Sequence, residues 1–285
     1  MRRIAISLSV LMLGFASLAS AAPVVTAGYD MQLYASGMGA IAGMQIGPDG
    51  KVYAVDNGGG RVFRVEDNGT VTQVASGIPY PNGIAFTKSG RMFVASGGGQ
   101  AVYEVVNGTA TVFANMGPGA FPTSVAALGD TLYVSNSGNG TIASVTMDGA
   151  VQVVLSGFSS GGGPFGLSFD ETGKMQFIDH ATGGVYSYNF KRPPKLVATV
   201  TPFGGTFTGT GFKDHLFFTD VELGYLLWRK NGDPTVFASE FARKVSPPAI
   251  GPNGIAYDGR KKLYVGDAGS IYVITKVKHG SEDDD

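Results

Sequence analysis

The sequence predicts an all-β protein, a six-bladed β-propeller with its N-terminal strand closing the last blade. Three observations lead to this fold class: a repeat of about 40 residues, short strands separated by turns inside each repeat, and a displaced strand at the N-terminal end. Glycine accounts for 44 of 285 residues, about twice its usual share. This excess is typical of many short strands joined by tight turns.

One strand recurs six times and sets the repeat. Each copy ends in a small polar or acidic residue, and the copies follow one another at intervals of 40 to 47 residues. A period of this length that contains only strands and turns indicates a propeller blade. The six copies end at Asp56, Ser96, Asn136, Asp179, Asp220 and Asp267.

Each copy lies between two further strands. A short apolar strand precedes it, which we expect to line the central channel, and a glycine-containing turn and a third strand follow it. The expected innermost strands begin at Ala42, Asn82, Thr123, Phe165, Thr208 and Asn253. The expected third strands cover residues 61–65, 101–105, 141–145, 184–188, 225–229 and 270–274.

The outermost strands show how the ring closes. They are expected at residues 71–77, 110–116, 151–157, 195–200 and 234–240, which gives five strands for six blades. Residues 31–37 have the same pattern but precede the first innermost strand. We therefore expect the N-terminal strand to complete blade six and to remove an open edge that would promote aggregation. One domain is expected over residues 22–276, with no second domain.

The two ends of the chain have different patterns. Arg2 and Arg3 precede an apolar run over residues 4–18, and Ala19-Ser20-Ala21 has the small residues of a cleavage site. This predicts a signal peptide over residues 1–21 and export to the periplasm or out of the cell. The run is shorter than the roughly 20 residues a bilayer requires, so no membrane span is expected after cleavage. Residues 277–285 are expected to form an acidic, disordered tail.

Composition excludes several functions. The net charge is −1 and no basic cluster is present, which argues against nucleic-acid binding. The chain has no Cys, so it has no disulfide, thiolate nucleophile or zinc-thiolate site. We expect a monomer without a cofactor, whose partner is a small molecule or an extracytoplasmic protein.

Topology predicts where a ligand would bind. In each blade the start of the innermost strand and the end of the second strand face the same mouth of the channel, where a ligand pocket is expected. Asn82 and Asn253 each precede Gly, so turn formation is an alternative explanation for them. Acidic residues at the ends of second strands commonly cap the following turn. The predicted ligand-binding residues are Asn82, Thr123, Phe165, Thr208 and Asn253.

Three segments carry a family resemblance. GPDGKVYAVDNGGGRVFRV (residues 47–65), PNGIAFTKSGRMFVAS (81–96) and GPNGIAYDGRKKLYVGD (251–267) resemble the repeats of the NHL and SMP-30/gluconolactonase-like six-bladed propellers. The resemblance covers nearly all of the chain after the signal peptide. It implies the fold, but the same frame carries lactonases, lyases, synthases and binding modules.

The resemblance also implies what a lactonase site would need. Metal-dependent lactonases of this kind carry a Glu, two Asn and an Asp at the starts of innermost strands. This chain retains Asn82 and Asn253 as metal candidates but has no carboxylate in that ring, and hard cations require anionic oxygen. Asp179 or Asp220 would have to turn inward to replace it.

His180 lies on the same predicted face and is the remaining catalytic candidate, as a general acid or base. Streptogramin-lyase-like propellers use His in this way, but their rings have seven blades. A single loop His is more often a solvated side chain.

Two functions remain after these observations. The first is an exported recognition protein that binds a small molecule or a partner at this mouth, which the neutral, partly apolar ring favours. The alternative is a divergent SMP-30-like hydrolase of lactones or esters, which the repeat resemblance and the Asn pair support. A divalent cation such as Ca²⁺ enters only with the second.

Overall fold

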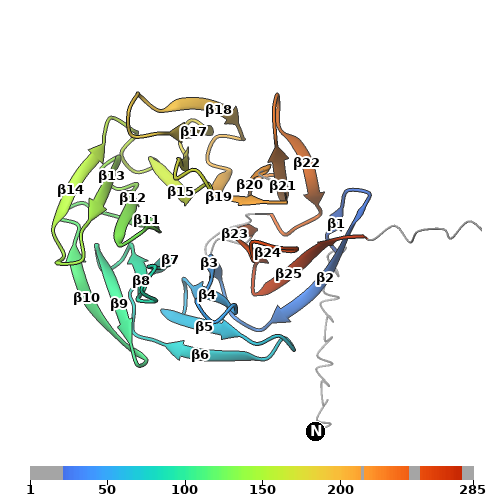
Figure 1. The fold of residues 1–285 in the computed structure, drawn as a ribbon, viewed down its shortest axis with the longest axis horizontal. Coiled ribbons are helices and arrows are strands. Elements are labelled where there is room, and N and C mark those ends of the chain that lie inside the picture. Colours follow the sequence, from blue (N-terminus) through green and yellow to red (C-terminus); the bar gives the residue numbers. More distant parts are fainter. Residues whose placement is uncertain (1–21, 213–214, 244–250, 278–285) are drawn as a thin grey trace, which may run out of the picture.

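The computed structural model describes residues 22–212, 215–243 and 251–277 as a ring of six antiparallel blades around a central channel, five of four strands and one of five (Figure 1). The six-bladed propeller and its closure by the N-terminal strand are confirmed. The predicted signal peptide and the acidic tail beyond Val277 lie outside the described residues. Among those described, no helix has the length and apolar character to cross a membrane.

Each blade runs from an inner strand at the channel to an outer strand at the rim. The inner strands are β3 (Ile41–Ile46), β7 (Pro81–Phe86), β11 (Pro122–Leu128), β15 (Pro164–Phe169), β19 (Gly205–Gly211) and β23 (Pro252–Tyr257). The second strands are β4 (Val52–Asp56), β8 (Met92–Ser96), β12 (Thr131–Asn136), β16 (Met175–Asp179), β20 (His215–Asp220) and β24 (Lys262–Asp267).

The outer half of each blade completes the sheet. The third strands are β5 (Arg61–Val65), β9 (Ala101–Val106), β13 (Thr141–Val145), β17 (Gly184–Tyr188), β21 (Tyr225–Arg229) and β25 (Ser270–Lys276). The outer strands are β6 (Val71–Ala75), β10 (Thr109–Asn115), β14 (Val151–Leu155), β18 (Lys195–Thr199), β22 (Thr235–Ser239) and, from the N-terminal end, β2 (Tyr29–Ser36).

The N-terminal segment joins two blades rather than one. Strand β2 pairs along its length with β25 and completes blade six. A two-residue strand that the sequence analysis did not predict, β1 (Val24–Val25), pairs with β22 and adds a fifth strand to blade five. The segment therefore covers the edge of β25 and part of the edge of β22, and it links blade five to blade six, the blade in which the N-terminal strand pairs with the last C-terminal strand.

The inner strands begin one residue earlier than predicted, except that of blade five, which begins three residues earlier, at Gly205 instead of Thr208. Relative to the other blades, the register of blade five was therefore predicted two residues too late. In β19 Gly205 pairs with Asp220, as Pro164 pairs with Asp179 in blade four, so Thr206 is the strand equivalent of Phe165. The error arose because the Thr and Gly residues of this segment alternate. A slip of two residues keeps every side chain on its predicted face, so the pattern alone cannot distinguish the two registers.

The hydrophobic core lies between the blades. In the described part of the chain, six clusters of buried side chains each join two neighbouring blades. Backbones also approach closely near the channel: a Cβ atom on Gly83 would lie 2.7 Å from Cα of Ser124 in the next blade. Glycine at this position therefore allows the inner strands to pack side by side.

Candidate ligand site

The mouth of the channel where the inner strands begin, here called the upper mouth, contains a pocket of about 180 Å³. Its walls come from the first residues of the inner strands, from the loops that precede them and, at Asn57, from the loop after β4. The lining residues are Ala40, Ile41, Ala42, Asn57, Tyr80, Asn82, Phe121, Thr123, Phe165, Phe207 and Asn253.

The structure brings four of the five predicted ligand-binding residues together at this pocket: Asn82, Thr123, Phe165 and Asn253. Thr208 does not reach it. Because the register of blade five differs from the prediction by two residues, Thr208 lies further down its strand, where its hydroxyl bonds to the Gly166 carbonyl and it lines a different cavity. Placing Thr208 at the upper mouth was therefore wrong.

Each inner strand carries a β-bulge near its start, as a break in register with the second strand shows in all six blades. A bulge re-aims side chains and is common beside binding sites. Here it follows or includes the second residue of the strand, the position of Asn82, Thr123, Phe165 and Asn253. These four side chains line the pocket, whereas further along each strand the side chains alternate regularly between the two faces of the sheet.

Asn82 is held by neighbouring blades. Its Oδ1 accepts a hydrogen bond of 2.7 Å from the Asn57 amide, and its Nδ2 donates one of 2.8 Å to the Pro122 carbonyl. Thr123 likewise donates to the Pro164 carbonyl at 2.8 Å and is 2% exposed. Both polar groups therefore connect one blade to the next, as well as lining the pocket.

Asn253 differs from Asn82 although both occupy the same position in their strands. It is 5% exposed and lines the pocket, and its side-chain amide makes no hydrogen bond with any residue that the structure describes. A side-chain amide has two donors and an acceptor that normally find partners when buried. Asn253 is therefore a buried polar group of this pocket that is available to a ligand.

Aromatic rings form much of the remaining wall, and sequence analysis missed three of them: Tyr80, Phe121 and Phe207. Tyr80 is 47% exposed and has a φ of +52°, a conformation that is unusual for an aromatic residue. Its ring centroid lies 6.1 Å from that of Phe121. A useful signal was the position of Tyr80 and Phe121 directly before the prolines that begin β7 and β11.

The acidic residues at the ends of the second strands serve the loops. Asp220 is fully buried and accepts hydrogen bonds from the backbone N–H groups of Thr201, Glu222 and Leu223. Asp179 accepts one from the Thr182 hydroxyl at 3.0 Å. Neither carboxylate lines the upper pocket, so the structure does not place them where a missing metal ligand would be needed.

Asp267 occupies the same position in blade six with fewer partners than Asp220, and like Asp179 it has one buried carboxylate oxygen without a partner among the described residues. Its Oδ2 accepts a hydrogen bond from the Ala242 backbone N–H, whereas its Oδ1 is buried without a partner in the described part of the chain. Burial raises the pKa of the Asp267 carboxyl, because removal from water disfavours its charged form, and the single backbone bond opposes this only in part.

His180 lies beside the pocket rather than in its lining. Its ring stacks on Phe165 at a centroid distance of 4.5 Å, and its Nδ1 lies 2.8 Å from the Gly205 carbonyl. Since a carbonyl only accepts, Nδ1 carries the hydrogen. This bond and the stacking fix the imidazole against the wall that Phe165 forms.

The pocket does not have the donor set of a divalent-cation site. Its described lining contains no Asp, Glu or His, and no group of three such residues suited to a metal occurs among the described residues. Of the two metal candidates, Asn82 already uses its oxygen to accept from Asn57. One amide oxygen, that of Asn253, does not satisfy the preference of Ca²⁺ for several oxygen ligands with anionic character.

The fold and the pocket define a six-bladed β-propeller with a neutral, aromatic cavity at one mouth of its channel. Solved structures that resemble this fold include three enzymes. A gluconolactonase from Xanthomonas campestris is 12% identical, with a TM-score of 0.72 over 89% of this chain and 94% of its own. A PQQ-bound aldose sugar dehydrogenase from Streptomyces coelicolor is 14% identical, with a TM-score of 0.68 over 88% and 99%.

The third is a virginiamycin B lyase from Staphylococcus aureus, 15% identical with a TM-score of 0.64 over 90% of this chain and 99% of its own. No protein-family model and no curated protein matches the sequence. At these identities the likeness extends to the fold, and the three named activities differ from one another. Function therefore depends on the side chains of this chain.

Proposed function

We propose that this chain is an exported recognition protein that binds a small, uncharged, partly aromatic molecule in the upper pocket. The observation that carries the proposal is the Asn253 amide, unpartnered within the described chain and set among the rings of Tyr80, Phe121, Phe165 and Phe207. Apolar walls with a few polar groups that fix orientation are typical of ligand pockets.

The chemistry of the lining sets the ligand class. No Lys, Arg, Asp, Glu or His side chain is among its described residues, so a charged ligand would lose hydration without gaining a partner. A flat apolar ring could stack against the aromatic walls, and a carbonyl or amide on it could pair with Asn253. Export rests on the N-terminal pattern of Arg2, Arg3 and the small residues at 19–21.

Binding can be tested with a library of neutral aromatic amides and lactams, screened by thermal shift and then titrated by calorimetry. Ala42 lines the upper pocket, so Ala42→Leu should fill it and weaken binding at least tenfold. Loss of binding in Asn253→Ala would support the assigned polar contact. Hits that bind the Ala42→Leu variant with the same affinity as the unaltered protein would contradict binding in the upper pocket.

A hydrolase of lactones or esters is the alternative, and the gluconolactonase fold neighbour gives it support at the level of fold. It is tested by turnover of lactones and aryl esters with and without added Ca²⁺, Zn²⁺ or Mn²⁺. We expect no turnover above buffer. Metal-dependent turnover that Asn253→Ala abolishes would replace the recognition proposal with the hydrolase one.

A further inference from the structure

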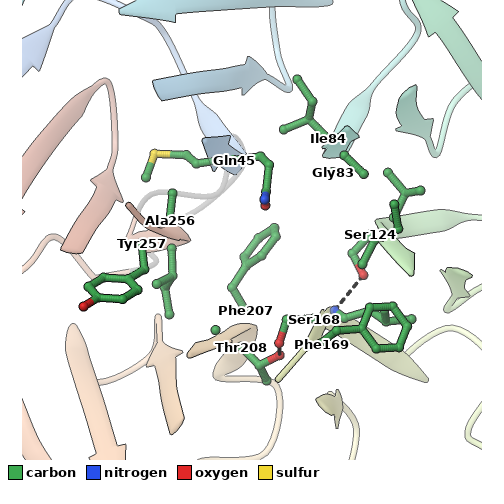
Figure 2. A pocket seen from close by; sticks show the side chains of 18 of the residues that line it. Gln45, Gly83, Ile84, Ser124, Ser168, Phe169, Phe207, Thr208, Ala256 and Tyr257 are labelled. Carbon is green, nitrogen blue, oxygen red and sulfur yellow. Dashed lines mark hydrogen bonds between the residues drawn. The ribbon is translucent and has the colours of Figure 1, made fainter. Parts of the chain in front are cut away.

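A second cavity lies at the opposite, lower mouth of the channel, where the inner strands end. Its volume is about 330 Å³, compared with about 180 Å³ for the upper pocket. Phe207 lines both cavities and so lies at the boundary between them. Figure 2 shows its ring in the middle of the lower cavity, with side chains of the surrounding strands around it.

The cavity exists because the fifth residue of most inner strands is small. Ser168 and three alanines leave the channel wide at this level, and Gly209 adds no side chain. Gln45 is the exception, and Figure 2 shows its side chain extending toward Phe207. The fifth residues are Gln45, Ala85, Ala126, Ser168, Gly209 and Ala256.

Two hydroxyl groups at this cavity already have partners. Ser124 accepts a hydrogen bond of 2.8 Å from the Leu167 backbone N–H and also bonds to Ser135. Ser168 bonds to Thr208 at 2.7 Å. They hold adjacent inner strands together, so a ligand would have to find its polar contacts elsewhere in the cavity.

The available groups are Gln45 and Glu171. Both side chains are exposed, both line the cavity, and neither makes a hydrogen bond or ion pair with a described residue. They come from blade one and blade four, which lie opposite each other in the ring (Figure 1). A ligand between them would contact the Gln45 amide on one side, the Glu171 carboxylate on the other, and the Phe207 ring in the middle of the cavity.

We propose that the lower cavity binds a neutral, polyhydroxylated molecule of monosaccharide size. Glu171 supplies only acceptors, whereas Gln45 supplies donors and an acceptor, so the ligand must both donate and accept. Hydroxyl groups do both. The C–H face of such a molecule would pack against Phe207, and the carboxylate of Glu171 would repel an anion. The proposal does not rest on the function proposed for the upper pocket, although Phe207 lines both cavities.

The ring provides a matched pair of variants that separates the two cavities. Ala126 and Ala42 both line the channel at half-buried positions, Ala126 in the lower cavity and Ala42 in the upper pocket. Ala126→Leu should fill the lower cavity, and Ala42→Leu should fill only the upper one. Gln45→Ala removes a proposed contact at an exposed position, so its effect does not depend on the fold tolerating a larger side chain.

The test is titration of the full chain with glucose, myo-inositol, gluconate and ethanolamine, followed by ligand-observed NMR. We expect glucose or myo-inositol to bind with a Kd on the order of 1 mM, and Ala126→Leu and Gln45→Ala to weaken this binding at least tenfold. Ala42→Leu should leave it unchanged, and gluconate should bind more weakly.

Three results would overturn the proposal. The first is that neither neutral probe binds at concentrations up to about 50 mM. The second is that Ala42→Leu abolishes sugar binding while Ala126→Leu does not, which would move the sugar to the upper pocket. The third is that ethanolamine binds here more tightly than either neutral probe, which would make the cavity a cation site.

Discussion

Asn57 donates a hydrogen bond of 2.7 Å to Oδ1 of Asn82, and this bond joins blade one to blade two at the wall of the upper pocket. Asn82 continues the connection into blade three through the Pro122 carbonyl. Its counterpart Asn253 makes no such bond within the described chain. Two residues with the same place in the repeat therefore have different roles, one in the ring and one at the pocket.

Single substitutions should separate these roles. Asn82→Ala leaves the Asn57 amide and the Pro122 carbonyl without this partner, and it should lower the free energy of unfolding by about 1–3 kcal/mol. Asn253→Ala removes no hydrogen bond to a described residue and should change the free energy of unfolding by less than about 0.5 kcal/mol while weakening ligand binding. Urea denaturation and calorimetry measure the two quantities. Equal losses of stability in both variants would refute the distinction.

Ring closure can be followed through the single Trp. Trp228 packs edge-on against Tyr29 of the closing strand β2, with ring centroids 5.8 Å apart. Deleting residues 22–38 removes β1 and β2, and should shift Trp228 emission to longer wavelength and cause aggregation. Deleting residues 22–27 removes only β1 and should lower the melting temperature by a few degrees.

The shorter deletion is the control, because it leaves β2 paired with β25. Light scattering and fluorescence of both variants check the prediction. If the protein without residues 22–38 melts as the full chain does, blade six does not depend on the N-terminal strand.

Asp267 should make stability depend on pH in the acid range. Its folded pKa is raised by burial, so the folded state favours its protonated form. Its stabilising contribution is fully present below the unfolded pKa of about 3.9 and is lost as the pH rises through the higher folded pKa. Asp267→Asn should flatten this dependence and raise the free energy of unfolding at pH 7, on the order of 1 kcal/mol.

Asn136 occupies the equivalent position in blade three and accepts from the Phe121 backbone N–H, so an amide fits this position. Asp220→Asn is the matched control. Asp220 receives three backbone N–H bonds, and losing its charge should destabilise the protein. Melting curves recorded from pH 4 to pH 8 compare the stability of the Asp267→Asn and Asp220→Asn variants. A destabilised Asp267→Asn protein at pH 7 would show that the charged carboxylate is favourable there.

Phe207 should control whether the two cavities communicate. In the other five blades its strand position holds a small residue: Gly43, Gly83, Ser124, Gly166 or Gly254. Phe207→Ala should join the cavities and weaken ligand binding in both. Since Phe207 is half-buried, the loss of stability should be below the roughly 3 kcal/mol of a fully buried Phe. A crystal structure of the variant with two separate cavities would disprove this role.

The ring was predictable from the repeat. Each blade places an apolar strand at the channel and a turn at the end of its second strand, and these two features recur about every 40 residues along the sequence. The closing strand at 31–37 was predictable because blade six otherwise lacks an outer strand. Strand β1 was not, since Val24 and Val25 are too few residues to show alternation. Thr208 was misplaced because a two-residue slip preserves alternation.

The site was predictable only in its location. Asn82 and Asn253 share a motif, and no local pattern shows that Asn57 lies beside one of them in the folded ring. No motif predicted the place of Phe207 between the two cavities, because that place depends on small residues in the five other blades. The lower cavity likewise depends on side chains from all six blades at one level of the channel, a relationship that appears once the strands are in register.

The most direct test of the central claim is a crystallographic fragment screen of the purified protein with neutral aromatic amides. We expect density in the upper pocket, with a ring against Phe165 or Phe207 and a polar atom within about 3 Å of the Asn253 amide. Fragments bound elsewhere with the upper pocket filled only by water, or a divalent cation bound beside Asn253, would contradict it.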